Sequence, residues 1–240
     1  MNSKLHNRRA SARPQPLPPF LQWTATGRAL VFVLAAASIW CLLAEFYGLC
    51  SMRTFTFAVL IPATIVLCAI ALLDRARGDR RLWRAVIIGT IGGFAAACAY
   101  DIFRLPWVIG YMNQVGPAWL RLPLFKVFPQ FGALILGQPL NQEFSLTAHV
   151  VGWIYHFSNG MTFGVMYMAV VGDAVRRSWL WAIVLAVGLE IMMLVTPYTS
   201  YFAIGMTALF VVVTLSAHLI FGVALGLIAR RMSNSAGLIA

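Results

Sequence analysis

Along the chain, long apolar runs alternate with short polar segments that are mostly basic. Six of the runs are candidates for membrane-spanning helices, because about 20 consecutive apolar residues cross a hydrocarbon layer ~30 Å thick. They cover residues 29–50, 54–73, 83–103, 148–171, 178–197 and 206–229. The pattern predicts an all-α, polytopic membrane protein in which residues 29–231 form one transmembrane domain of six helices.

The residues before the first run are basic and rich in proline. Residues 1–28 contain "RPQPLPPF" and too few apolar positions for a core, so we expect a disordered arm. The apolar region of a cleaved signal peptide has only ~7–15 residues. The run at 29–50 is longer, and we expect it to be retained as the first transmembrane helix.

The distribution of Lys and Arg predicts how the chain is oriented. These residues gather before the first run, between the second and third, between the fourth and fifth, and after the sixth. All four segments lie on one side of the membrane if the runs cross it in turn, and an excess of Lys and Arg marks the cytoplasmic side. We therefore expect both termini in the cytoplasm (N-in/C-in), with residues 232–240 as a short cytoplasmic tail.

Composition agrees with lipid as the solvent. The chain is 61% hydrophobic and 10% charged, with a mean hydropathy of +0.82, whereas soluble domains are roughly 45–50% apolar and about 25% charged. The net charge of +11 is divided among the loops, so no basic face for nucleic acid is predicted. The expected partner is the lipid bilayer, and a homo-oligomer or a partner membrane subunit stays possible. The cysteines lack CxxC spacing and are expected to pack as small hydrophobic side chains.

A long segment, residues 104–147, separates the third and fourth runs and is predicted to be external. Its aromatic residues, such as Trp107, Tyr111 and Trp119, suit the headgroup region. Its apolar piece "VFPQFGALILG" is too short to span, which favours interfacial or re-entrant placement. Two interpretations stay open: a surface loop with a short amphipathic helix, or a lid over a cavity that opens outward.

Few ionisable residues interrupt the runs, where each costs about 2.5–3.5 kcal/mol at a helix centre on insertion scales. Glu45, Asp101 and His149 fall near the outer boundary, and His156, Asn159, Glu190 and His218 fall nearer the midplane. Asp101 has a basic neighbour, Arg104, one turn along its helix. Glu190 and the histidines have none within one or two turns of their own helices, so their partners must come from another helix, water or a ligand. We predict an outward-leaning polar pocket lined by the four deeper residues, with the other three nearer its mouth.

Two of the runs share the motif HxxxGxxxG. "HFSNGMTFG" begins at His156 and "HLIFGVALG" at His218, and the predicted topology makes the two helices parallel. Such glycine grooves allow close helix packing, and polar side chains bond across these interfaces for about 0.6 kcal/mol on average. "GTIGG" at 89–93 has a similar groove without a histidine. Helix packing is therefore the simplest interpretation, and a proton- or solute-handling cavity of His156, Glu190 and His218 is the functional one.

A metal or haem site is a third interpretation. Neutral imidazole binds iron, copper and zinc, and two histidines beside glycines that admit a macrocycle would suit a bis-histidine haem b. A metal would be held by His156, His218 and Glu190. Neither CxxCH nor the ExxH motif of helical di-iron proteins occurs, so we expect no cofactor, with haem b or a metal ion as the alternative. GxSxG and GxxxxGKS are also absent, which indicates a non-enzymatic protein.

The second half of the chain carries short motifs that resemble one family. They are "HVVGW", with His149 and Trp153, "FGVMY" at the end of the same helix, "WLWAIVLAVG", and "SAHLIFG" followed by a terminal Arg pair. Over roughly the last ninety residues the chain resembles the YagU-like small inner-membrane proteins of bacteria. The activity of that family is unassigned, so the resemblance implies a bacterial cytoplasmic (inner) membrane and no chemistry.

Three functional hypotheses follow from the sequence. In the leading one, the protein moves or senses a proton or small solute. His156 and His218 alternate in protonation, and Glu190 acts as their counter-charge. The second is a membrane redox protein with histidine-ligated haem or metal. The third is a structural membrane subunit without a ligand site, whose histidines serve only helix association.

Overall fold

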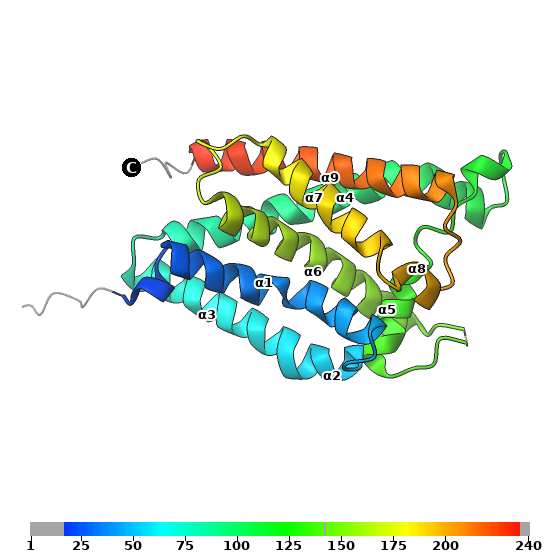
Figure 1. The fold of residues 1–240 in the computed structure, drawn as a ribbon, viewed down its shortest axis with the longest axis horizontal. Helices are drawn as coiled ribbons and strands as arrows, with labels where there is room; N and C mark the ends of the chain where they lie inside the picture. The colour runs from blue at the N-terminus through cyan, green and yellow to red at the C-terminus, as the bar shows by residue number, and fades with distance from the viewer. Residues whose placement is uncertain (1–16, 142, 236–240) are drawn as a thin grey trace, which may run out of the picture.

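The computed structural model describes residues 17–141 and 143–235. These residues form helices and loops without a β-strand, so the all-α prediction is confirmed for them. The long helices run side by side along the long axis of the molecule (Figure 1). They are α1 (Ala25–Phe46), α3 (Ile61–Arg77), α4 (Arg81–Met112), α6 (Leu146–Val171), α7 (Leu180–Leu194) and α9 (Ala208–Ser235). The short helices are α2 (Met52–Phe55), α5 (Val127–Leu136) and α8 (Tyr198–Tyr201).

Four helical segments of the described residues are long and apolar enough to cross a membrane. They are Ala25–Phe46, Met52–Arg77, Arg81–Met112 and Ala208–Ser235; the second joins α2, a π-helical turn and α3. α6 has 26 residues but carries polar side chains along its length, and α7 is apolar but has only 15 residues. The fold is thus compatible with an integral membrane protein and has four candidate spans by length and hydropathy, and the fourth and fifth predicted spans remain a prediction.

The structure describes the predicted arm only from residue 17 on, and this part is folded. The Thr24 hydroxyl caps α1 by accepting a hydrogen bond from the Gly27 N–H. The Trp23 indole donates to the Gly172 carbonyl oxygen, 2.9 Å away, at the end of α6. The expectation of disorder is therefore wrong for residues 17–28, because a helix cap and a long-range hydrogen bond hold them.

α4 is longer than the apolar run that predicts it. It continues past Phe103 to Met112 and includes Pro106, although proline removes a helical hydrogen bond and disfavours the α conformation just before it. Asp101 and Arg104, just before this proline, are both buried. This ion pair therefore belongs to the interior of the bundle and not to the start of an external loop.

The segment 104–147 folds back into the bundle. Of the ten residues of α5, eight are buried. α5 crosses α6 at backbone contact: a Cβ on Gly132 would lie 1.8 Å from the Ala148 carbonyl oxygen, and one on Gly152 would lie 1.8 Å from that of Phe128. The surface-loop interpretation is wrong for α5, because its glycine lets an apolar helix too short to span pack against α6.

Glycine contacts set the spacing of the long helices. A Cβ on Gly93 of α4 would lie 2.1 Å from the Gly160 carbonyl oxygen of α6, and one on Gly164 would lie 1.9 Å from that of Gly89. Helices can approach this closely only where both surfaces lack side chains. The glycines of the second motif, on α9, face α7 in the same way.

The two ends of the bundle differ in what they carry. The start of α1, the end of α9 and the α3–α4 and α6–α7 connections lie at one end, and α2, α5 and α8 lie at the other (Figure 1). α9 reaches Ser235, so the predicted tail, residues 232–240, begins as helix, and residues 236–240 lie outside the described residues. Among the described residues, Arg28 and the other three basic segments of the sequence therefore gather at a single end.

Candidate functional site

The interior of the bundle holds two neighbouring cavities. The first, of about 180 Å³, is bounded by α1, α4, α6, α7 and α9, and by α5 and α8 at one end. The second, of about 230 Å³, is bounded by α4, α5, α7, α8 and α9 and by the loops at 122–124 and 204–207. The sequence-predicted residues His156, Asn159, Glu190 and His218 all line the first cavity. Tyr100, Phe128, Glu190 and Tyr198 line both cavities.

His156 forms the tighter of two histidine–carboxylate pairs. Its Nε2 lies 2.8 Å from Asp101 Oδ2, and because a carboxylate only accepts, Nε2–H is the donor. Arg104 lies 3.8 Å from the other oxygen of Asp101 and donates to the Leu124 carbonyl oxygen. The His156 ring stacks on Phe128 with 4.1 Å between centroids. Asp101 thus has a permanent cation beside it and needs no added proton to be balanced.

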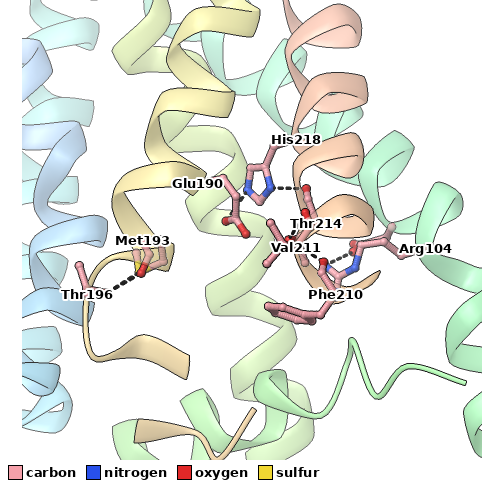
Figure 2. A network of polar contacts seen from close by, with 9 residues as sticks. Arg104, Glu190, Met193, Thr196, Phe210, Val211, Thr214 and His218 are labelled. Carbon is pink, nitrogen blue, oxygen red and sulfur yellow. Dashed lines mark hydrogen bonds and ion pairs between the residues drawn. The ribbon is translucent and has the colours of Figure 1, made fainter. Parts of the chain in front are cut away.

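His218 and Glu190 form the second pair, from α9 and α7, and point toward one another (Figure 2). His218 Nε2 lies 3.5 Å from Glu190 Oε2. His218 Nδ1 lies 2.9 Å from the Thr214 carbonyl oxygen, which can only accept, so Nδ1 carries a proton. A neutral His218 would therefore turn the lone pair of Nε2 toward Glu190. The tautomer is set by the backbone of α9 itself.

Tyr100 joins the two pairs. Its ring centroid lies 6.0 Å from that of His156 and 4.9 Å from that of His218. The Arg104 guanidinium carbon lies 4.5 Å from the centre of the Tyr100 ring and 5.5 Å from that of Phe128. Aromatic faces attract cations, more strongly where water is excluded. The rings around both pairs therefore favour positive charge.

These contacts define one polar network, made of Tyr100, Asp101, Arg104, His156, Glu190 and His218. The network contains two carboxylates and one guanidinium. With both histidines neutral and both carboxylates ionised it carries one net negative charge. Charges inside a membrane protein pair with one another because an unpaired one is costly. One additional positive charge, such as a proton, would balance this network.

Asn159 adds an unpaired acceptor to the first cavity. Its side-chain Oδ1 is buried and has no hydrogen-bond partner among the described residues. Nearby, the Thr162 hydroxyl bonds to the Asn159 backbone oxygen and to the Ser38 hydroxyl, 2.8 Å away. The Tyr155 hydroxyl donates to the Ser38 carbonyl oxygen. These contacts hold α6 against α1, and the buried amide oxygen of Asn159 is left without a hydrogen-bond partner among the described residues.

The three residues predicted nearer the mouth lie elsewhere. Glu45 accepts hydrogen bonds from the Met52 N–H and the Tyr201 hydroxyl. Burial, together with this contact to Glu45, raises the pKa of the Tyr201 phenol, which therefore stays a donor. His149 is exposed near Phe144. Asp101, through His156, belongs to the network, so none of the three lines the first cavity.

Sequence reasoning missed the aromatic part of the site. Tyr100 stands directly before Asp101 in "AYDIFR", and Phe128 lies in the apolar piece of the long segment. A tyrosine beside an intramembrane carboxylate is a usable signal, since both need polar partners. The position of Phe128 gave no such signal, because it depends on how α5 folds back.

The haem interpretation loses its structural basis. It required open glycine surfaces next to the histidines, but α4 covers Gly160 and Gly164, and α7 covers Gly222 and Gly226. A macrocycle has no room against either surface. Within the described residues, no group of three or more His, Cys, Asp or Glu side chains is placed to hold a metal ion.

Comparison with known proteins gives no relative. No family model matches the chain, and no curated protein and no solved structure matches it. The resemblance of the last part of the chain to YagU-like proteins therefore stays a prediction, and the function has to be argued from the cavity and its network.

Proposed function

We propose that this chain is a non-enzymatic integral protein of the bacterial cytoplasmic membrane that exchanges a proton and a small solute in the first cavity. The observation that carries the proposal is the Glu190–His218 pair, which lines that cavity and has its tautomer fixed by Thr214. His156 and Asp101 hold the helices together beside it.

The geometry of the second pair supports a shared proton. Because Nδ1 of His218 is committed to Thr214, a bare Nε2 would face an ionised Glu190 carboxylate at 3.5 Å. Two atoms with lone pairs repel at this distance, more strongly inside a protein than in bulk water. One proton removes the conflict, either as an imidazolium next to a carboxylate or as an imidazole next to a carboxylic acid. The pair is therefore a proton-binding site.

The two cavities provide access to this proton. Glu190 and Tyr198 line both, so a proton or solute in either cavity can reach the same carboxylate. The second cavity is bounded by the loops near α5 and α8, at the end of the bundle away from the basic segments. In a membrane with the basic end inside, that cavity leads toward the outer face.

The proposed topology has six crossings with both termini in the cytoplasm. Its support is that, among the described residues, Arg28 at the start of α1, the α3–α4 and α6–α7 connections and the end of α9 lie at one end of the bundle (Figure 1), and an excess of Lys and Arg marks the cytoplasmic side. α6 is long enough to cross at 1.5 Å per residue, and α7 is extended by α8 toward the same end as α5.

Histidine protonation in lipid nanodiscs tests the proposal. The protein is labelled with ¹⁵N-histidine, and signals are assigned with His218→Gln and His156→Gln. We expect Nδ1 of His218 to keep its proton at every pH, and Nε2 to gain or share a second proton as pH falls. Glu190→Gln should shift this step, because the amide cannot hold the proton or balance an imidazolium.

His156 serves as the internal control, since its Nε2–H already donates to Asp101 and Glu190→Gln should leave that proton in place. A His218 that stays in the opposite neutral tautomer, protonated only on Nε2, would contradict the proposal. That result would favour a structural subunit in which both histidines serve helix association.

A further inference from the structure

We propose that the solute is a small lipophilic monocation, which enters the first cavity from the bilayer between α1 and α7 and replaces the proton of the Glu190–His218 pair. This inference rests on the proposed function above and names the chemical class of its solute.

The lining of the cavity has the composition of a cation site. The cavity that Glu190 lines is also lined by the rings of Phe131, Phe163, Tyr198 and Phe221. Aromatic cages with a nearby carboxylate recognise alkylammonium groups, because ring faces attract the cation and the carboxylate balances it. Outside the network, the cavity is also lined by Asn159, whose amide oxygen is an acceptor without a partner among the described residues. An anion would be repelled by the Glu190 carboxylate, and the Tyr198 hydroxyl, a donor in the cavity lining, carries no charge that could balance it.

The net charge of the network determines that one bound cation replaces one proton. Without the shared proton the network has one net negative charge, from Asp101 and Glu190 against Arg104. Binding one monocation restores neutrality, so the proton on the pair leaves to the solvent as the cation arrives. The other titratable groups facing the pair are Tyr100 of α4, His156 of α6 and Tyr198 of α8. His156 is committed to Asp101, and the tyrosines are neutral donors.

The entrance lies between two helices that pack on different neighbours. Ile39 and Leu43 of α1 and Met192 of α7 all line the cavity. α1 packs mainly on α6 and α3, whereas α7 packs on α9. Met192 is 63% exposed on the outside of the bundle, so this part of the rim faces lipid. A route through hydrocarbon admits molecules with a large apolar surface and selects against strongly hydrated ions.

The size of the cavity limits the ligand to about one ring with a small charged group. A closed apolar cavity of about 150 Å³ accepts benzene, and this one has about 180 Å³ and is partly open. Benzyltrimethylammonium matches this description. Its neutral isostere, neopentylbenzene, has the same shape without the charge and is the matched control.

Isothermal titration calorimetry of the protein in nanodiscs tests the inference, with empty nanodiscs as the blank. Benzyltrimethylammonium is titrated in two buffers of different ionisation enthalpy, which reports protons released per cation bound. We expect one proton released, and affinity about tenfold weaker for each pH unit below the point at which the pair is protonated. Neopentylbenzene should release none.

Variants locate the site. Glu190→Gln should abolish cation binding, and Glu143→Gln, which changes an exposed carboxylate outside the cavity, should leave it unchanged. Glu190→Asp keeps the charge and should retain weakened binding, which separates loss of charge from misfolding. Met192→Trp at the rim should slow entry without changing the proton count.

Three outcomes would overturn the inference: equal binding of the neutral isostere, cation binding without proton release, or tighter binding of benzoate than of the cation. If His218 shares its proton as proposed but no cation binds, only this inference fails. If the cation binds while His218 never shares a proton, the proposed function itself fails.

Discussion

The two HxxxGxxxG helices carry the same spacing but hold their histidines in different ways. His156 is 2.8 Å from a carboxylate that also has an arginine beside it, and its ring is stacked on Phe128. His218 is 3.5 Å from Glu190, whose charge no arginine pairs with directly among the described residues, and both line the cavity. The Asp101–His156 pair is closed, because Arg104 balances the charge of its carboxylate. The Glu190–His218 pair is open, because it lines the cavity and lacks one positive charge.

This difference shows that the motif itself encodes helix spacing and not chemistry. In both helices the glycines serve the same purpose, because each set meets the backbone of a neighbouring helix. The role of each histidine depends on the carboxylate that the neighbouring helix supplies. Four changes test the comparison, beginning with the largest expected effect.

Asp101→Ala should be the most destabilising change. It leaves Arg104 as a buried cation without its carboxylate and His156 without an acceptor, and breaking a buried pair in this way costs about 3–5 kcal/mol. Denaturation of the detergent-solubilised protein measures the free energy of unfolding. The double variant Asp101→Ala with Arg104→Met removes both charges and should recover part of the loss. Equal stability of Asp101→Ala and wild type would show that the pair is not closed as described.

Gly164→Ala should have the next largest effect on stability. The added Cβ would lie 1.9 Å from the Gly89 carbonyl oxygen, so α4 and α6 must move apart. Overpacking of this kind typically costs about 1–3 kcal/mol. Gly188→Ala is the matched control, because a Cβ there meets nothing within 4 Å, and alanine should stabilise that helix slightly. Equal melting temperatures for the two variants would contradict the close α4–α6 contact.

His218→Gln should abolish proton exchange, whereas His156→Gln should keep it. Glutamine at 218 cannot share a proton with Glu190, so cation-driven proton release from proteoliposomes should fall more than about tenfold, equivalent to about 1.4 kcal/mol. Glutamine at 156 can still donate to Asp101 and leaves the open pair intact. Loss of exchange in both variants alike would show that the two histidines act as one unit.

Much of the fold follows from hydrophobic pattern alone. The six apolar runs each correspond to a long helix, because a long continuous apolar run favours a helix, whose backbone groups are hydrogen-bonded internally. The ends of the helices and the placement of the short helix α5 were less predictable from the sequence. α4 continues through Pro106, and α5 is buried, because contacts with distant segments outweigh the local signals of proline and short length.

The candidate site, like the fold, was predicted from the sequence only in part. Depth along each run identified His156, Asn159, Glu190 and His218 as needing partners from other helices, and all four line one cavity. The sequence could not tell which carboxylate meets which histidine, since that depends on how helices turn about their axes. It also placed Asp101 at the mouth, whereas the length of α4 carries Asp101 into the bundle beside His156.

His149→Gln should have the smallest effect, although His149 shares its helix and its heptad spacing with His156. His149 is exposed and its ring contacts only that of Phe144, at 6.5 Å between centroids, in the described residues. Surface substitutions without specific partners usually change stability by less than about 0.5 kcal/mol. Unfolding and proton release should both match wild type. A loss of exchange here would extend the site to the exposed start of α6, and the sequence-predicted position of His149 at the mouth would then be right.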